Sequence, residues 1–533
     1  MEKICRESDL LHCQGGVVRA PFLIKGKIIV PPEINMEQIE AAFRDADKDT
    51  VYVKLSNAQL IREPVIDRKT LRYTGEYVYQ VLPPVSGPEL VETNIDRLAH
   101  GLYALSVADI LEYLELLSAA LLKNQELVAQ VREICRLTAE HPDAFLDGWF
   151  AAFPSLLNCE AARQMINNEL SLWGRPGGDF LDGWVEVPGG VIPGLVPSLA
   201  QALFGQDMTA HQPVKTLMRA MPTRQLHITA GNAPVIPIVS ALRAILTKSA
   251  AVIKSPYGAT ITGALFGLAA AAVAPDHPIT QNLSVVYWPG GDESIESLLF
   301  RPNAFDRIVV WGTPETITSV QSKAPFTKTV CFNPRYGVSL IGREAFDGSL
   351  EKAAVKAAMD SMIDNQKACI ASLVHYIEGT EEQARSYAER LRQTLRQWDG
   401  LTPQFVLPAV RGQLKRMKRG KYSRAHWYIN SQKEEFTSGV IVMPGEFDIL
   451  DHPMCRLVIV RPVDNLTDVL RYLHQGVSTV GIYPEERRLA LRDRILARGV
   501  SNVLPLGQCE RIFAGMPHDG MMVLSQLVDW KNA

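Results

Sequence analysis

The sequence lacks two motifs that define common cofactor and metal sites. No Gly-x-Gly-x-x-Gly follows any of its predicted strands, which excludes the usual glycine-rich dinucleotide loop. The eight cysteines are scattered, with no Cys-x-x-Cys pair and no paired Cys/His ligand spacing. This pattern argues against a zinc site and is typical of free thiols in a reducing compartment.

The sequence also lacks an excess of charge and a long hydrophobic run. Its formal net charge of −3 gives no overall attraction to nucleic acid or to an anionic membrane. The apolar run Ala264–Ala274 is too short to span a bilayer. The segment Met1–Asp9 has no apolar core and does not resemble a signal peptide. We therefore expect a cytoplasmic protein with no membrane span and no nucleic-acid partner.

The chain is long and apolar enough for more than one core. Its 533 residues are 47% hydrophobic, as expected of a soluble protein with two or three domains. The first hundred residues are rich in predicted strands, and no chemistry stands out in them. The strand candidates are Val17–Ile24, Lys27–Val30, Val51–Leu55 and Gly75–Val81. Ser106 and Asp109 form a capping box that predicts the start of a helix, and a second helix is expected over Ala161–Trp173.

From about residue 224 to 330, strands alternate with helices. Alternation at this spacing predicts βαβ units and a parallel sheet. The predicted strands are Gln225–Thr229, Ala250–Ile253, Leu283–Trp288 and Asp306–Trp311. Ligands bind such sheets at the carboxyl ends of the strands, which places Asn232, Lys254, Gly290 and Gly312 along one rim.

The turn after the fourth of these strands begins a helix. Thr313 is a good N-cap and Pro314 a good first helical residue. Gly312 leaves room for a phosphate to approach the exposed N–H groups at this helix terminus. A plain strand-to-helix turn without a ligand is the alternative interpretation.

A second α/β region follows residue 330 and contains Cys369. This cysteine lies between a polar Asn-Gln-Lys turn and the apolar run Ile370–Val374, so its thiol is expected at the floor of a cleft. A thiolate with a lowered pKa is a strong nucleophile toward acyl carbonyls. The alternative is a buried structural cysteine, since a free cysteine packs as a small hydrophobe.

Four of these residues are spaced as in a known family. The chain resembles the aldehyde dehydrogenase superfamily and, within it, the LuxC-type acyl-CoA (fatty acyl) reductases. Separations of 22, 58 and 57 residues link, in order, Asn232, Lys254, Gly312 and Cys369. The segment His227–Pro234 resembles the LuxC version of the asparagine turn. The segment Met516–Gly520, together with Trp530, resembles the C-terminal signature of the LuxC family.

The resemblance implies an α/β fold like that of aldehyde dehydrogenases. A Rossmann-type cofactor domain is expected over residues 101–330 and an α/β catalytic domain over 331–490. Residues 1–100 form an extra β-rich N-terminal segment. Residues 491–533 return to the cofactor and oligomerisation region, and we expect a homo-oligomer.

The resemblance further implies NADPH-dependent reduction of an acyl thioester to an aldehyde through an acyl-cysteine on Cys369, with NADH as a second possible cofactor. The oxyanion is held by the Asn232 amide and the backbone N–H of Cys369. Candidate cofactor-binding residues are Lys254, Ser255, Gly312 and Thr313, and no metal is expected. The expected partners are an acyl-CoA or acyl-carrier-protein thioester and a protein that donates the acyl group.

Two departures from the superfamily pattern bear on the reaction. Aldehyde oxidisers carry a glutamate about 34 residues before the cysteine, where this chain has Arg335, and no carboxylate lies between Cys331 and Gly342. Without a positioned base, an acyl-enzyme hydrolyses slowly. The Glu-x-Phe motif of the family is not recognisable near His452–Arg456.

The sequence leaves several alternatives open. The chain as a whole is consistent with an aldehyde-oxidising NAD(P) dehydrogenase, or with an acyl-carrying partner subunit that has no reductase activity. His518 and Asp519 either form a local turn or close the active site. The segment Arg411–Trp427 carries seven basic residues and no acid, and is either a solvated face or a docking patch for an anionic partner.

Overall fold

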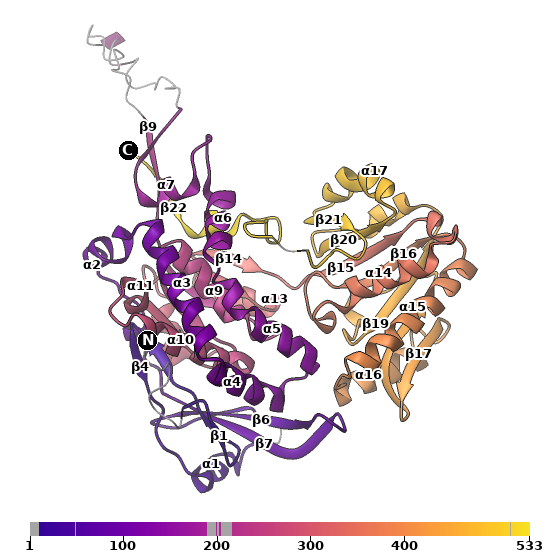
Figure 1. The fold of residues 1–533 in the computed structure, drawn as a ribbon, viewed down its shortest axis with the longest axis horizontal. Helices are drawn as coiled ribbons and strands as arrows, with labels where there is room; N and C mark the ends of the chain where they lie inside the picture. Colours follow the sequence, from indigo (N-terminus) through magenta and orange to yellow (C-terminus); the bar gives the residue numbers. More distant parts are fainter. Residues whose placement is uncertain (1–9, 48–49, 189–198, 200–201, 204–215, 512) are drawn as a thin grey trace.

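The computed structural model describes residues 10–47, 50–188, 199, 202–203, 216–511 and 513–533. Its elements form two lobes that are joined by the chain between β14 (Lys328–Phe332) and β15 (Tyr336–Ile341) and by the C-terminal segment (Figure 1). No helix in these ranges combines the length and apolar content needed to cross a membrane.

The N-terminal segment folds as a five-stranded sheet with the order β1-β2-β7-β6-β5. Its strands and its helix are β1 (Cys13–Gln14), β2 (Val17–Arg19), β5 (Tyr52–Lys54), β6 (Gln59–Asp67), β7 (Arg72–Leu82) and α1 (Met36–Phe43). The sequence did not predict β6. Pro64 interrupts its pattern, and the structure accommodates the proline at a register shift between Pro64 and Ile66.

The β6–β7 hairpin reaches across to the second lobe. Near its tip, Arg72 forms an ion pair of 3.2 Å with Glu435, and the rings of Tyr73 and Phe405 lie 4.9 Å apart. The N-terminal sheet therefore contacts both lobes.

The first lobe contains a seven-stranded sheet with the order β14-β13-β10-β11-β12-β3-β4. Its remaining strands are β3 (Phe22–Ile24), β4 (Lys27–Ile29), β10 (Arg224–Ile228), β11 (Ala250–Lys254), β12 (Leu283–Val286) and β13 (Arg307–Trp311). The five strands from β10 to β14 are parallel, as predicted for βαβ units. The pairs Ile228↔Lys254 and Lys254↔Val286 align the carboxyl ends of three strands.

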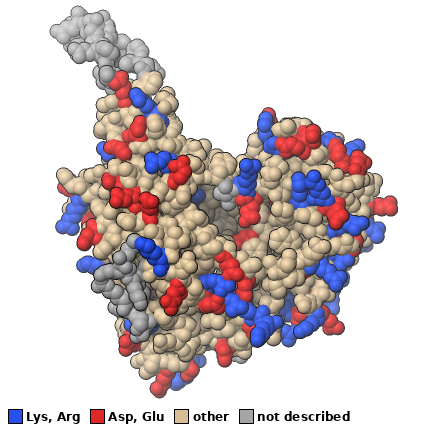
Figure 2. Space-filling view, viewed as in Figure 1, with Lys and Arg blue, Asp and Glu red and all other residues tan. Residues whose placement is uncertain are grey.

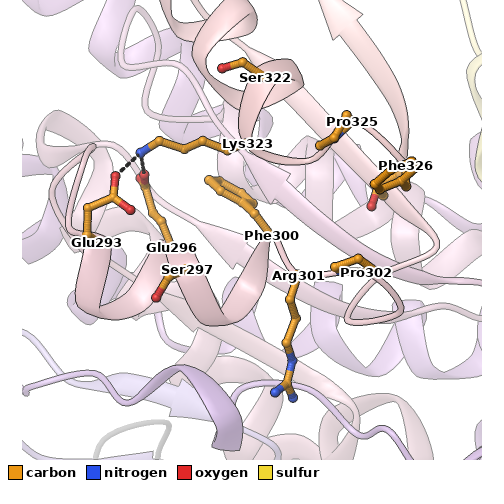
Figure 3. A pocket seen from close by; sticks show the side chains of 11 residues that line it. Glu293, Glu296, Ser297, Phe300, Arg301, Pro302, Ser322, Lys323, Pro325 and Phe326 are labelled. Atoms are coloured by element: carbon orange, nitrogen blue, oxygen red, sulfur yellow. Dashed lines mark hydrogen bonds and ion pairs between the residues drawn. The ribbon is translucent and has the colours of Figure 1, made fainter.

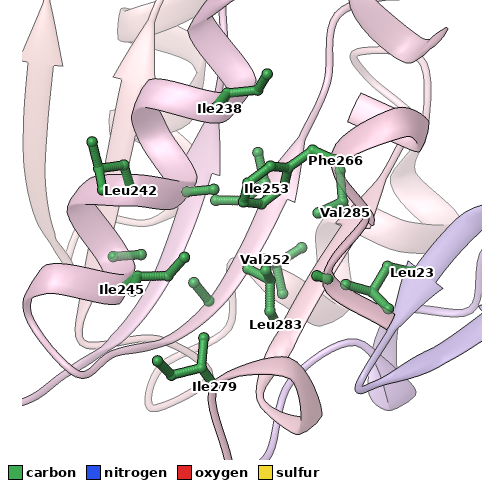
Figure 4. Packing of buried hydrophobic residues seen from close by; sticks show 14 of the residues in the cluster. Leu23, Ile238, Leu242, Ile245, Val252, Ile253, Phe266, Ile279, Leu283 and Val285 are labelled. Atoms are coloured by element: carbon green, nitrogen blue, oxygen red, sulfur yellow. The ribbon is translucent and has the colours of Figure 1, made fainter. Parts of the chain in front are cut away.

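Helices cover both faces of this sheet and form the largest core. They are α2 (Ile95–His100), α3 (Val107–Lys123), α4 (Gln125–Thr138), α5 (Asp143–Leu156), α6 (Cys159–Leu170), α7 (Gly177–Asp182), α9 (Ile236–Leu246), α10 (Thr260–Val273), α11 (Pro278–Gln281), α12 (Glu293–Leu299), α13 (Pro314–Lys323) and α18 (Val523–Leu527). The capping box of Ser106 and Asp109 begins α3 as predicted. The second predicted helix, α6, ends at Leu170, earlier than predicted, because Ser171 is already extended, and Trp173 beyond it has a positive φ of 48°. Leu242, Val252 and Phe266 pack together in the core (Figure 4).

The second lobe has its own seven-stranded sheet, with the order β17-β18-β19-β16-β15-β20-β21. Its remaining strands are β16 (Ser372–Glu378), β17 (His426–Gln432), β18 (Glu435–Val442), β19 (Leu457–Val463), β20 (Val477–Tyr483) and β21 (Asn502–Pro505). Its helices are α14 (Leu350–Met362), η5 (Ile363–Gln366), α15 (Glu381–Leu401), α16 (Pro408–Arg419), η7 (Leu466–Tyr472) and α17 (Glu485–Leu496).

A small sheet projects from the first lobe (Figure 1). Its order is β22-β9-β8, formed by β8 (Val185–Val187), β9 (Thr216–Met221) and β22 (Asp529–Asn532). The last residues of the chain therefore leave the second lobe and pair with the first, as Asp529↔Met221 shows.

A left-handed turn separates α14 from the cysteine loop. Asp364, Asn365 and Gln366 have φ values of 50°, 55° and 67°. Because none is a glycine, each costs roughly 1–2 kcal/mol in this conformation. Buried side-chain hydrogen bonds offset this cost: Gln366 donates to the carbonyl of Leu457 over 2.8 Å and accepts from its N–H over 3.1 Å.

The buried guanidinium of Arg456 completes the anchor of this turn. Its Nε donates to Asn365 Oδ1 over 2.6 Å, its Nη2 to Thr402 Oγ1 over 2.9 Å, and its Nη1 lies 3.1 Å from Asp399 Oδ1. One fully buried cation therefore ties the turn to α15 and to the start of β19.

We expect Arg456→Ala to destabilise the second lobe by about 3–5 kcal/mol, because it leaves Asp399 as a buried carboxylate without its partner. Urea unfolding, followed by tryptophan fluorescence, measures this loss. The matched control is Arg492→Ala, which removes an exposed arginine from α17 and should change stability by less than about 0.5 kcal/mol. Equal unfolding curves for the two variants would contradict the anchoring role.

Candidate functional site

A cavity lies at the carboxyl ends of the parallel strands of the first lobe. Its volume is about 480 Å³. It is lined by residues that end or follow β10, β11, β12 and β13, among them Thr229, Lys254, Trp288, Gly290 and Trp311. This is the edge at which open parallel sheets bind ligands. The structure thus brings Lys254 and Gly290 together on one rim, as predicted.

Lys254 is the one positively charged residue among the described residues that line this cavity. Its side chain is buried, and its Nζ lies 5.7 Å and 5.4 Å from the ring centroids of Tyr287 and Trp288. Burial lowers the pKa of Lys254 to about 8, against the opposing influence of Glu296. A buried ammonium between aromatic rings is suited to donate hydrogen bonds to a polar or anionic ligand.

The other predicted cofactor residues, Ser255, Gly312 and Thr313, are not among the residues that line the cavity, although their neighbours Pro256 and Thr316 are. Thr313 is the N-cap of α13 with Pro314 in the first turn, and its Oγ1 accepts from the N–H of Thr316 over 3.5 Å. A side chain at Gly312 would lie 3.1 Å from Thr316, which lines the cavity. The buried Ser255 Oγ has no hydrogen-bond partner among the described residues.

The surface is hollowed between the two lobes (Figure 2). Asn232 of the first lobe contacts the loop that precedes Cys369 in the second lobe. The Asn232 Nδ2 donates to the carbonyl of Lys367 over 3.4 Å, two residues before the cysteine. The Lys367 side chain points elsewhere, to an ion pair of 2.8 Å with Glu140. The His141 Nε2 lies 3.0 Å from the carbonyl oxygen of Asn232, so both the side chain and the backbone of this residue have a fixed contact.

The Cys369 thiol is partly buried, and its pKa is raised rather than lowered. Burial raises the pKa to about 11, and the carboxylates of Asp519 and Asp364 act in the same direction. Arg335 lowers it, but by less than burial raises it. The lowered pKa expected of a nucleophile is therefore not observed, because burial of the thiol outweighs the effect of Arg335.

The Met516–Gly520 segment packs against the end of the first-lobe sheet. His518 Nδ1 accepts a hydrogen bond from Arg243 Nη2 over 3.0 Å. The His518 ring lies 5.2 Å from the Trp311 ring and 4.7 Å from the Phe332 ring. Burial, together with Arg243 and Arg335, lowers the pKa of His518 to about 3, so its ring is neutral and accepts from the guanidinium. His518 holds the segment in place, and Asp519 is the residue that reaches the cysteine electrostatically.

Sequence reasoning missed Arg243, Ser478 and Arg456. Arg243 is the one charged residue of the otherwise apolar helix α9, and a buried charge in such a helix is a signal of a specific partner. Arg456 lies in the segment where the Glu-x-Phe motif was not recognisable, and its role there is the anchor of the left-handed turn. Ser478, whose Oγ donates to the carbonyl of Cys369 over 2.5 Å, has no local signal in the sequence.

Two other surface features lie beyond this cavity. A cavity of about 410 Å³ lies beside α12 and α13 near the amino ends of the strands and shares Glu296 with the first cavity; its Lys323 is paired with Glu293 and Glu296 (Figure 3). Residues 411–419 of the basic run lie in helix α16, in which Arg411 is paired with Glu435, and the run ends in β17. No group of three or more His, Cys, Asp or Glu side chains in the described part of the chain is arranged to hold a metal ion.

Comparison of the sequence with known proteins finds one family. The model of the family described as acyl-CoA reductase (LuxC) matches residues 209–530. The long-chain acyl-protein thioester reductase of Photorhabdus laumondii is 30% identical over 336 residues, which cover 59% of this chain and 65% of that protein. The Vibrio harveyi protein of the same name is 28% identical over 327 residues, covering 58% and 64%. The match thus spans less than two thirds of each relative.

Comparison of the structure finds aldehyde dehydrogenase folds. An aldehyde dehydrogenase from Brucella melitensis biovar abortus 2308 superposes with a TM-score of 0.66 at 13% identity, over 98% of this chain and 99% of that one. An NADP-dependent glyceraldehyde-3-phosphate dehydrogenase from Bacillus halodurans C-125 gives 0.66 at 12% identity, over 96% and 98%. The predicted fold class, aldehyde-dehydrogenase-like α/β, is confirmed.

We expect alkylation of Cys369 by iodoacetamide to be slow at neutral pH and to rise steeply as the pH approaches 11, because only the thiolate reacts and burial raises the pKa to about 11. Peptide mass spectrometry of the full chain, without added ligands, measures the rate at Cys369 separately from that at the exposed Cys13. A plateau already reached at pH 8 would contradict the raised pKa.

Proposed function

Because the chain belongs to the LuxC acyl-CoA reductase family, we propose that it reduces an acyl thioester to an aldehyde with NADPH, through an acyl group carried on Cys369. The observation that carries this proposal is the contact between the Asn232 amide and the cysteine loop, beside a ligand cavity at the same sheet edge. The names of the relatives support an acyl-protein thioester as donor. An acyl-CoA or acyl-carrier-protein thioester has the same reacting group.

The thiolate of Cys369 attacks the carbonyl carbon of the thioester, and the thiol of the donor leaves. The tetrahedral oxyanion accepts hydrogen bonds from the Asn232 amide and the Cys369 backbone N–H. Each such donor lowers the activation barrier by about 3–4 kcal/mol. His141 fixes the backbone of Asn232, and the contact with the Lys367 carbonyl orients its side-chain amide toward the cysteine loop.

Hydrolysis of the acyl-enzyme is disfavoured by the charge at position 335. Arg335 stands where aldehyde oxidisers carry a glutamate, and its Nε lies 3.4 Å from Asp519 Oδ1. The nearest carboxylate of the C-terminal segment is thus engaged by a guanidinium and is a poor base for water. The acyl group remains on Cys369 until it is reduced.

We take this cavity as the site of the nicotinamide dinucleotide. Its lining offers the ammonium of Lys254 and the aromatic surfaces of Trp288 and Trp311, together with the carboxylates of Glu296 and Glu315. Ser255, which follows Lys254, has a buried Oγ with no hydrogen-bond partner among the described residues. Lys254 and Ser255 would hold the adenosine ribose or its 2′-phosphate, while Gly312 and Thr313 would meet the pyrophosphate at the α13 N-terminus. The bound cofactor supplies the hydride that converts the thioester to the aldehyde.

Two other functions use the same cysteine. Oxidation of aldehydes needs a base for water, which the guanidinium at position 335 disfavours. An acyl-carrying subunit without reductase activity would acquire the acyl group but would not use the cofactor cavity. Acylation of the protein by acyl-CoA tests the nucleophile, and the later addition of NADPH separates a reductase from a carrier.

Mixing the full chain with a long-chain acyl-CoA should add one acyl mass to Cys369, detected by intact-mass and peptide mass spectrometry. Added NADPH should then remove the adduct and release aldehyde. The Asn232→Ala variant should form the adduct about 10²–10³-fold more slowly, because it loses one oxyanion donor. An adduct that persists in Cys369→Ala would refute the nucleophile, and an adduct stable to NADPH and NADH would identify a carrier.

Lys254→Ala should raise the KM for NADPH at least about tenfold, because a hydrogen-bonded charge pair to phosphate is lost. If Lys254 contacts a 2′-phosphate, the KM for NADH should change much less. Steady-state kinetics with both cofactors measures the difference. The control is Lys352→Ala, which removes an exposed lysine of α14 in the second lobe, away from the cavity. Equal losses for NADPH and NADH would rule out the 2′-phosphate contact.

A further inference from the structure

Arg335 and Asp519 form an ion pair between segments that are far apart in the sequence. Arg335 lies in the connection from β14 to β15, and Asp519 in the Met516–Gly520 segment. The Arg335 Nε is 3.4 Å from Asp519 Oδ1, and the Arg335 Nη2 donates to the Asp519 carbonyl over 3.5 Å. Only 15% and 5% of the two side chains are exposed, so solvent screens the pair weakly.

A short series of hydrogen bonds connects this pair to the cysteine. The Arg335 Nη1 donates to Ser501 Oγ over 3.1 Å, and the Ser501 N–H donates to the Ser478 carbonyl over 3.1 Å. The Ser478 Oγ donates to the carbonyl of Cys369 over 2.5 Å. The guanidinium is therefore held in a fixed position relative to the cysteine by the amino ends of β20 and β21.

Three charged groups act on the Cys369 thiol, each from a different element. Asp519 from the C-terminal segment and Asp364 from η5 raise its pKa, and Arg335 lowers it. The pKa of Asp519 is itself raised by burial, while Arg335 and Arg243 lower it. In Asp364, burial raises the pKa to about 7, against Lys367 and in the same direction as Glu510.

We propose that the Arg335–Asp519 pair adjusts the charge state of Cys369 within the environment that burial sets. The guanidinium favours the thiolate and the carboxylate opposes it, so the two members of one ion pair act on the nucleophile with opposite signs. Asp519 is a positioning residue: it orients Arg335 and limits its effect on the thiol. The Met516–Gly520 segment, which His518 attaches to the first lobe, thereby influences the ionisation of the Cys369 thiol in the second lobe.

The proposal rests on the proposed function only in taking Cys369 as the nucleophile. Its test needs neither thioester nor cofactor, so failure of the test and failure of the reductase assay are distinguishable. The measurement is the pH profile of Cys369 alkylation by iodoacetamide in the full chain, read by peptide mass spectrometry.

Asp519→Asn removes the opposing anion and leaves the Arg335 guanidinium free to act on the thiol, so the profile should shift to lower pH. Arg335→Gln removes the cation, so the profile should shift to higher pH. A shift of one pKa unit changes the thiolate fraction about tenfold below the pKa. Because nucleophilicity falls with thiol pKa, the rate at pH 8 should change by about threefold per unit, upward for Asp519→Asn and downward for Arg335→Gln.

Two further variants separate charge from folding. Arg335→Lys keeps the positive charge and should leave the profile close to that of the wild type. Ser501→Ala removes one contact of Arg335 without changing any charge and should shift the profile less than Arg335→Gln does. Shifts of Asp519→Asn and Arg335→Gln in the same direction, or no shift in either, would overturn the proposal. Slower alkylation in Asp519→Asn would also overturn it and would instead mark Asp519 as the proton acceptor for the thiol.

Discussion

The buried guanidinium of Arg456 is the interaction on which the site depends. Three consecutive residues before the cysteine loop, Asp364 to Gln366, are left-handed without being glycine, a conformation that a free chain avoids. Arg456 and the backbone of Leu457 hold the buried amides of this turn, and Asp399 balances the charge. The position of Cys369 is thus determined in the core of the second lobe, and a ligand entering the cleft meets a loop that is already shaped.

This anchoring explains the unusual state of the thiol. A loop held by a packed core places its cysteine among buried neighbours, and burial disfavours the thiolate. The ammonium of Lys367, in the turn before the cysteine, is engaged by Glu140. Arg335, from the chain segment that enters the second lobe, lowers the pKa of the thiol, and Asp519 opposes it. The family register marks Cys369 as the proposed nucleophile, whereas the ionisation of its thiol depends on residues that are distant along the chain.

The parallel strands β10 to β13 and the rim with Lys254 and Gly290 could be predicted because apolar runs alternate with Gly and Pro turns at βαβ spacing. The aldehyde-dehydrogenase-like fold followed from the register of Asn232, Lys254, Gly312 and Cys369. Contacts between distant segments could not be predicted: Asp519 is 150 residues beyond Cys369, and no periodicity records that Arg335 pairs with it. The strand β6 was missed because Pro64 breaks the alternation that identifies strands.

The chain crosses between the lobes twice, once from β14 to β15 and once after β21 toward β22. Arg335 lies on the outward crossing and Asp519 on the return. Their ion pair therefore joins the two connections between the lobes. Any movement of one lobe against the other must either keep both connections together or separate this pair.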